Sequence, residues 1–140
     1  MDRTVVHFEI PADDPERAVD FYGSLFGWDI YQWKEGEGAA EDYWMVSTVP
    51  IDGERHPLRP WVNGGIVRRR HPAQGPVNYV KVESIDQFVS DALGLGAELV
   101  KPKTPVARMG WLALLKDTEG NVFGLWQAIA PESATESDAA

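Results

Sequence analysis

The sequence predicts an α+β protein built from two repeats, each with the element order β-α-β-β-β. In each half, a segment that alternates apolar and polar residues, as strands do, precedes one segment with helical periodicity. The halves meet at residues 70–76, where Pro and Gly cluster. Because neither half alone covers both sides of its sheet, we expect one domain over residues 1–130, with repeats at about 4–71 and 76–128.

The first half opens with an alternating strand at residues 5–10. A helix follows, since Asp14 can cap it and Pro15 suits its first position, where an amide N–H would have no partner. Gly27 ends this helix. Its apolar face is expected to consist of Ala18, Tyr22, Leu25 and Phe26. Further strands are predicted at residues 28–33, 43–49 and 65–69.

The second half repeats this order, beginning with a strand at residues 77–82. Ser84 and Gln87 have the spacing of a reciprocal capping box at the start of a helix, which Gly94 and Gly96 end. The apolar stripe of that helix is predicted to be Ile85, Phe88, Val89, Ala92 and Leu93. Further strands are predicted at residues 97–100, 111–115 and 122–127.

Composition excludes several classes of function. With 13 Lys and Arg against 22 Asp and Glu, the net charge of -9 repels phosphate backbones, so nucleic acid is not an expected partner. The absence of cysteine excludes disulfide scaffolds, cysteine zinc sites and thiol nucleophiles. No apolar run is long enough to span a bilayer and no signal peptide is evident, so we expect a cytoplasmic protein without a membrane partner. Residues 131–140 read as a disordered acidic tail.

The motifs of the chain resemble those of one family. Residues 7–10, 13–18, 21–22 and 26–28 are similar to the opening of the vicinal oxygen chelate superfamily, and residues 117–125 are similar to its closing hairpin. That superfamily includes glyoxalase I, the bleomycin resistance proteins and the extradiol dioxygenases. The resemblance covers residues 4–128 and implies two β-α-β-β-β modules forming a cup-shaped open barrel. The ending of the chain looks most like the branch related to lactoylglutathione lyase.

The resemblance also implies four metal-ligand positions, most of which lack a donor in this chain. The first falls on His7, the third on Val77 and the fourth on Gly124. The second falls on Gly64 or Gly65. Catalytic zinc normally has three protein ligands, and glycine and valine side chains offer no lone pair. We therefore expect no cofactor, while a divalent metal held incompletely by His7 stays open.

Strand alternation predicts which side chains face the cup, because every second residue of a strand lies on one face. His7 and Glu9 are candidates for catalysis, unless they form only a hydrogen-bonded polar pair. Tyr79 and Trp126 are candidates for binding, unless they pack in the core, and glycine can mark where a ligand approaches a strand. The predicted substrate-binding residues are Tyr79, Lys81, Gly124 and Trp126.

Two classes of function follow. One is a bleomycin-resistance-like module that binds a small aromatic or amphipathic molecule in the cup, without a complete metal site. The other is an enzyme: a metal-dependent lyase, isomerase or dioxygenase, or a metal-free enzyme with His7 and Glu9 as acid and base. Six tryptophans offer apolar surface beyond one small core, so a homodimer is expected.

Overall fold

The structure, a computed structural model, describes residues 3–33 and 43–129 and divides them into two compact units. The first unit, called here the first module, is Val5–Asn78. The second module contains residues 3–4 and the described chain from Tyr79 onward. The predicted tail at residues 131–140 lies outside the described residues.

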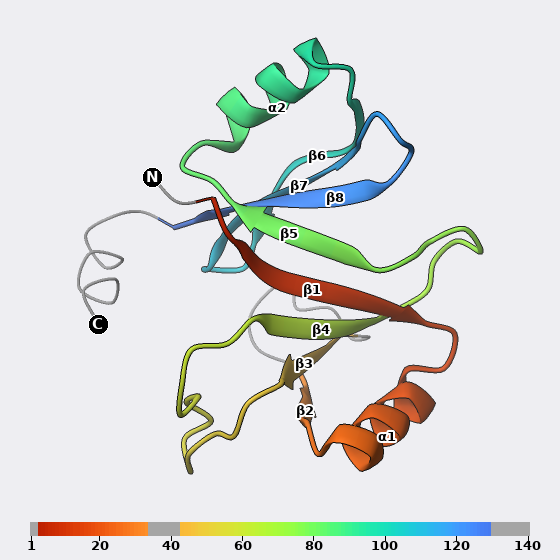
Figure 1. Ribbon diagram of the computed structural model, residues 1–140, viewed down its shortest axis with the longest axis vertical. Coiled ribbons are helices and arrows are strands. Elements are labelled where there is room, and N and C mark those ends of the chain that lie inside the picture. Colours follow the sequence, from red (N-terminus) through yellow and green to blue (C-terminus); the bar gives the residue numbers. More distant parts are fainter. Residues whose placement is uncertain (1–2, 34–42, 130–140) are drawn as a thin grey trace. The chain divides into compact units, whose positions relative to one another are not determined.

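The first module contains one helix and a sheet of four strands. Its elements are β1 (Val5–Ala12), α1 (Pro15–Phe26), β2 (Asp29–Gln32), β3 (Tyr43–Ser47) and β4 (Asn63–Arg68). The strands lie in the order β2-β3-β4-β1, as Figure 1 shows. β1 is parallel to β4, whereas the other neighbours are antiparallel. The predicted order β-α-β-β-β is confirmed.

The second module repeats this topology. Its elements are β5 (Val77–Lys81), whose first two residues belong to the first unit, α2 (Ile85–Gly94), β6 (Glu98–Val106), β7 (Gly110–Lys116) and β8 (Val122–Ala128). The strands lie in the order β5-β8-β7-β6, with β5 parallel to β8 and the other pairs antiparallel. Among the described residues, no helix is long and apolar enough to cross a membrane.

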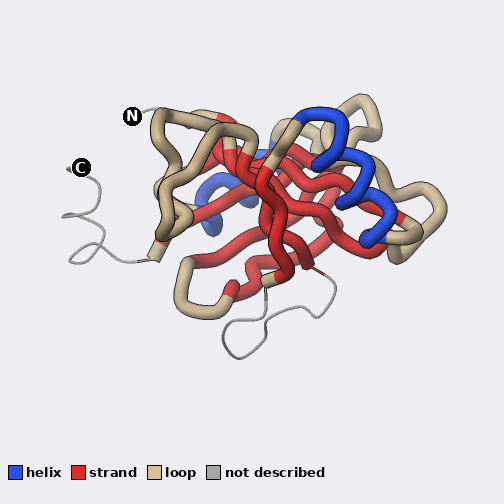
Figure 2. The backbone as a smooth tube through the Cα atoms, turned by 90° about the horizontal axis from the view of Figure 1, so that it is seen from below, coloured by secondary structure: helices blue, strands red, loops and turns tan. Residues whose placement is uncertain are grey.

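Each helix covers one face of the sheet in its own module (Figure 2). In the first module, buried Trp44, Val46 and Ile66 form a core against which Phe8 and Ile10 of β1 pack. This places Phe8 and Ile10 on the helix side, as the alternation of β1 predicts. In the second module the corresponding core is Val82, Ile85, Ala113, Leu115 and Leu125.

The helices start where predicted, but their apolar faces are narrower than predicted. Asp14 accepts a hydrogen bond from the amide of Arg17, and Ser84 accepts one from the amide of Gln87. The reciprocal bond, from the Ser84 amide to the Gln87 side-chain oxygen, is not formed among the described residues, and the Gln87 side-chain nitrogen donates to Asp91. Near the C-terminal end of each helix, apolar side chains that were predicted to face the core are exposed to solvent. They are Leu25, Phe26 and Leu93.

Strand β6 is much longer than the predicted segment at residues 97–100. It continues through Pro102 and Pro105 to Val106, with shifts in its register to β7 on either side of Lys101. Proline lacks an amide donor and is confined to sheet edges and bulges. β6 pairs with β7 alone and therefore tolerates both prolines, which a sequence-based boundary treats as a strand end.

Tyr79 belongs to the interior of the second module. Its side chain is 4% exposed, and it stands beside Gly124 in the register of β5 and β8. A Cβ atom added to Gly124 would clash with the Tyr79 ring. The space that glycine leaves on this strand is therefore filled by a neighbouring aromatic ring.

We predict that Gly124→Ala lowers the free energy of unfolding by roughly 1–3 kcal/mol, because a buried ring has to move to admit the methyl group. Gly75→Ala is the matched control, since a Cβ at Gly75 meets open space. Denaturant unfolding measures both. Equal stability of the two variants would show that the Tyr79 ring does not depend on glycine at position 124.

Candidate functional site

The candidate site lies on the first module's sheet, on the face opposite α1, which we call the open face. The strand registers place Glu9 and Met45 on either side of Gly65, Tyr31 beside Met45, and Asp29 beside Ser47. These residues alternate with the helix-side core residues. The open face contains His7 and Glu9 from β1, Gly65 from β4, Tyr43, Met45 and Ser47 from β3, and Asp29 and Tyr31 from β2.

His7 and Tyr43 are joined across an intervening strand. Nε2 of His7 lies 2.6 Å from the Tyr43 hydroxyl oxygen and shares a hydrogen bond with it. β4 separates the strands that carry these residues. A Cβ atom at Gly65 would clash with the Tyr43 hydroxyl, so glycine at this position leaves the space that the tyrosine occupies. The register also shows that Gly65, rather than Gly64, shares the open face with His7 and Glu9.

Burial changes the protonation of His7. Desolvation lowers the pKa of its imidazole from 6.5 to about 4, because burial removes water that would stabilise the charged form of the ring. The ring is therefore neutral at pH 7. A neutral imidazole with so low a pKa is a weak general base, since acid–base catalysis is most effective when the pKa is near the working pH.

Glu9, the predicted partner of His7, is half-buried on the same face, two residues along β1. The His7 ring is also hydrogen-bonded to Tyr43, a residue that the sequence analysis did not single out. The Tyr43 ring also meets the Trp33 ring edge-on, with centroids 5.9 Å apart. The sequence offered one signal for Tyr43: it is an aromatic residue on a predicted strand whose neighbour in the sheet contains Gly65. That signal does not specify a hydrogen bond to β1.

The donor set does not fit a divalent cation. Val77, Gly65 and Gly124, at three of the four positions that the resemblance assigns to ligands, have no donor side chain. At the remaining position, the Nε2 atom of His7 is engaged by Tyr43. Within residues 3–33 and 43–129, no three His, Cys, Asp or Glu side chains gather as a metal-binding group.

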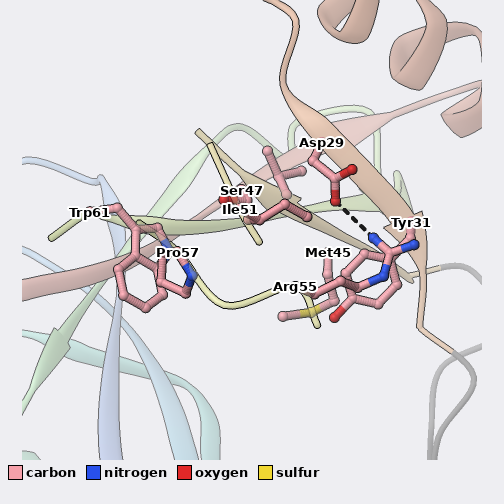
Figure 3. A pocket seen from close by; sticks show the side chains of 9 residues that line it. Asp29, Tyr31, Met45, Ser47, Ile51, Arg55, Pro57 and Trp61 are labelled. Carbon is pink, nitrogen blue, oxygen red and sulfur yellow. Dashed lines mark hydrogen bonds and ion pairs between the residues drawn. The ribbon is translucent and has the colours of Figure 1, made fainter. Parts of the chain in front are cut away.

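The open face also contains a pocket that the sequence did not predict (Figure 3). It has a volume of about 130 Å³ and lies between β2, β3 and the loop that connects β3 to β4. Trp61 and Pro57 lie at one side, and Tyr31 with Arg55 at the other. Its lining is Asp29, Tyr31, Met45, Val46, Ser47, Ile51, Arg55, Pro57 and Trp61.

An ion pair closes one end of the pocket. Nη1 of Arg55 donates to Oδ2 of Asp29 at 2.7 Å, and the guanidinium carbon lies 4.0 Å from the centroid of the Tyr31 ring. Both charged side chains stay partly exposed, so the pair contributes little to stability. Asp29 and Arg55 are far apart in the sequence, so a search for motifs of nearby residues could not predict this ion pair.

The predicted binding residues of the second module fall into two pairs. Tyr79 and Gly124 are in register and buried, as described above. Lys81 and Trp126 are also in register; Lys81 is exposed and Trp126 half-buried. The structure thus brings His7 and Glu9 together in one module, and Lys81 and Trp126 together in the other. Their substrate-binding and catalytic roles stay predictions.

We predict that His7 makes the protein less stable as the pH falls. The unfolded chain takes up a proton near pH 6.5, whereas the folded ring does so only near pH 4. Across that window the unfolded state binds more protons, so the free energy of unfolding falls by up to about 3 kcal/mol. Denaturant unfolding between pH 7 and 4 should show this loss in the wild type and less of it in His7→Gln. Parallel pH curves for the two proteins would contradict the assignment.

Comparisons with known proteins agree with this architecture. Residues 4–40 match the family model described as bleomycin resistance protein-like N-terminal. No curated protein matches the sequence.

Among solved structures, the chain resembles the hypothetical protein BH1468 from Bacillus halodurans, with a TM-score of 0.62, 12% identity, and coverage of 94% of this chain and 98% of that one. It also resembles a Streptomyces coelicolor methylmalonyl-CoA epimerase, with a TM-score of 0.64, 14% identity and coverage of 92% and 100%. For the Mycobacterium tuberculosis methylmalonyl-CoA epimerase the TM-score is 0.61, the identity 14%, and the coverage 94% and 91%. The chain therefore has the bleomycin-resistance and vicinal oxygen chelate fold, in two β-α-β-β-β modules.

Proposed function

We propose that the protein binds a small aromatic or amphipathic molecule on the open face of the first module, without a metal ion. The observation that carries this proposal is the pocket between β2, β3 and the loop from β3 to β4. Binding sites for small molecules are concave and mostly apolar, with a few polar groups that fix orientation. Here Met45, Ile51 and Trp61 supply the apolar walls, while Asp29 and Arg55 supply the polar groups.

The size of the pocket limits what it can hold. A cavity of about 150 Å³ in another protein accepts benzene, so about 130 Å³ suits one aromatic ring or a short branched chain. A larger ligand would extend along the open face toward Tyr43 and His7. The half-buried Trp33 and Tyr43 rings on that face favour an aromatic or amphipathic body.

The hydrogen bond between His7 and Tyr43 supports binding without a metal. A divalent ion at Nε2 of His7 would have to break that bond and would find no donor at Gly65. The structural relatives include an epimerase in complex with 2-nitronate-propionyl-CoA. At 14% identity this likeness shows a shared fold alone.

A metal-free enzyme is the second candidate, because His7 and Glu9 share the open face. In that case His7 acts as a base and Tyr43 as the group that orients it. The low pKa of His7 favours binding over acid–base catalysis at neutral pH. Turnover that His7→Ala abolishes, in a variant that still binds the molecule, would favour the enzyme.

We also propose that Tyr79, Lys81, Gly124 and Trp126 contribute to ligand binding within the second module, and that the protein is a homodimer. Support for the first point is that Lys81 and the half-buried Trp126 are in register on neighbouring strands. Support for the second is the group of exposed apolar side chains on α1, which includes Phe21, Leu25 and Phe26.

We expect Trp61→Ala to weaken the binding of a neutral aromatic probe, benzyl alcohol, at least fivefold, because the variant removes one wall of the pocket. Backbone amide NMR shifts of residues 51–61 report binding. Trp126→Ala is the comparison, since Trp126 does not line this pocket, and we expect it to leave benzyl alcohol binding there unchanged. If benzyl alcohol moves none of these amide signals at millimolar concentration, the proposed function fails.

We expect the melting temperature to change by less than about 1 °C on adding Zn²⁺, Mn²⁺, Ni²⁺ or Fe²⁺, or on treatment with a chelator. A metal that binds the folded state tightly would stabilise it by several kcal/mol through mass action. A rise of many degrees that disappears in His7→Ala would establish a metal site and overturn the metal-free proposal.

A further inference from the structure

We propose that the pocket selects small aromatic carboxylates, and that Arg55 is the residue that recognises their negative charge. This inference rests on the proposed function, since it specifies which molecules the same pocket takes. It draws on the backbone of the loop from β3 to β4, the contacts of the Arg55 guanidinium, and the apolar walls opposite it.

The loop holds Arg55 in an unusual backbone conformation. The Asp52 carboxylate accepts hydrogen bonds from the amides of Glu54 and His56, at 2.8 and 2.9 Å, and Ile51 forms a bridge with Pro57. Arg55, between them, has a φ of 65°, in the left-handed region that side chains other than glycine rarely adopt. Such strain persists where the surrounding structure imposes it, and it often accompanies a functional position.

The guanidinium of Arg55 is placed for a planar anion. It stacks over the Tyr31 ring at 4.0 Å, which fixes its plane, and it donates one hydrogen bond, to Asp29. Among the described residues, no other acceptor is hydrogen-bonded to this guanidinium. A guanidinium presents a fork of N–H donors that matches a carboxylate, so donors remain for a ligand at the mouth of the pocket.

The rest of the pocket suits a ring attached to that carboxylate. Met45, Ile51 and Trp61 are apolar, and the volume of about 130 Å³ is close to that of one aromatic ring. Figure 3 shows Arg55 at the end of the pocket opposite Trp61. A ligand can therefore place its ring against Trp61 and its carboxylate on Arg55.

The Asp29 carboxylate makes with Arg55 the same kind of ion pair that we propose for the carboxylate of the ligand. The Asp29 carboxylate lies 2.7 Å from the guanidinium, where it holds Arg55 in place but also repels a second carboxylate. A cationic ligand would have to separate Arg55 from Asp29 and leave the guanidinium beside a like charge. Local geometry therefore favours an anion, although the whole chain is acidic.

The test compares three probes of similar size: benzoate, benzyl alcohol and benzylamine. Dissociation constants are measured from the NMR shifts of the backbone amides of residues 51–61, at pH 7 and low salt. We expect benzoate to bind at least tenfold more tightly than benzyl alcohol, because charge-assisted hydrogen bonds are about twice as strong as neutral ones. Benzylamine should bind most weakly.

Three variants locate the effect. Arg55→Gln should weaken benzoate binding at least tenfold, and by a clearly larger factor than it weakens benzyl alcohol binding. Arg59→Gln is the matched control, since Arg59 is an exposed arginine of the same loop that does not line the pocket. Asp29→Asn should tighten benzoate binding severalfold, because it removes the competing carboxylate; a purely structural role for the ion pair predicts the opposite.

The outcomes separate this inference from the proposed function. Equal affinity for benzoate and benzyl alcohol would overturn anion selection while leaving small-molecule binding intact. Tighter binding of benzylamine would show that Asp29, not Arg55, recognises the ligand. Binding of none of the three probes would overturn both proposals. Should Arg55→Gln fail to fold, weaker benzoate binding in Asp29→Asn would by itself contradict the role given to Asp29.

Discussion

The hydrogen bond between the Tyr43 hydroxyl and Nε2 of His7 passes over β4 at Gly65, and the character of the open face depends on that crossing. The Tyr43 hydroxyl occupies Nε2 of His7, the atom that would otherwise be available to a metal ion. Burial of the imidazole on this face lowers the pKa of His7, so the ring is neutral at pH 7. A side chain at position 65 would clash with the Tyr43 ring and hydroxyl group, so the tyrosine would have to move.

The charges lining the pocket belong to Asp29 and Arg55. These two side chains come from β2 and from the loop before β4, and they meet at 2.7 Å above the Tyr31 ring. Arg55 thus places a positively charged group at the pocket of a chain whose net charge is -9. Long-range attraction by the acidic chain favours cationic molecules, while short-range hydrogen bonding to Arg55 favours anions in the proposed site.

The sequence was sufficient for the order of elements and for the faces of the strands, because both follow from local periodicity. The helix starts at Asp14 and Ser84 and the helix-side position of Phe8 were predictable in this way. The bond between His7 and Tyr43 was not, because it depends on a register across three strands.

Glycine illustrates the limit most clearly. Gly65 and Gly124 were expected to leave room for a ligand, whereas the tyrosines Tyr43 and Tyr79 fill that space. The most direct test is the ¹⁵N spectrum of the His7 imidazole at pH 7 and pH 5, with and without equimolar Zn²⁺. We expect a neutral ring at both pH values whose signals zinc does not move. Protonation near pH 6.5, or a zinc-dependent shift of Nε2, would contradict the account.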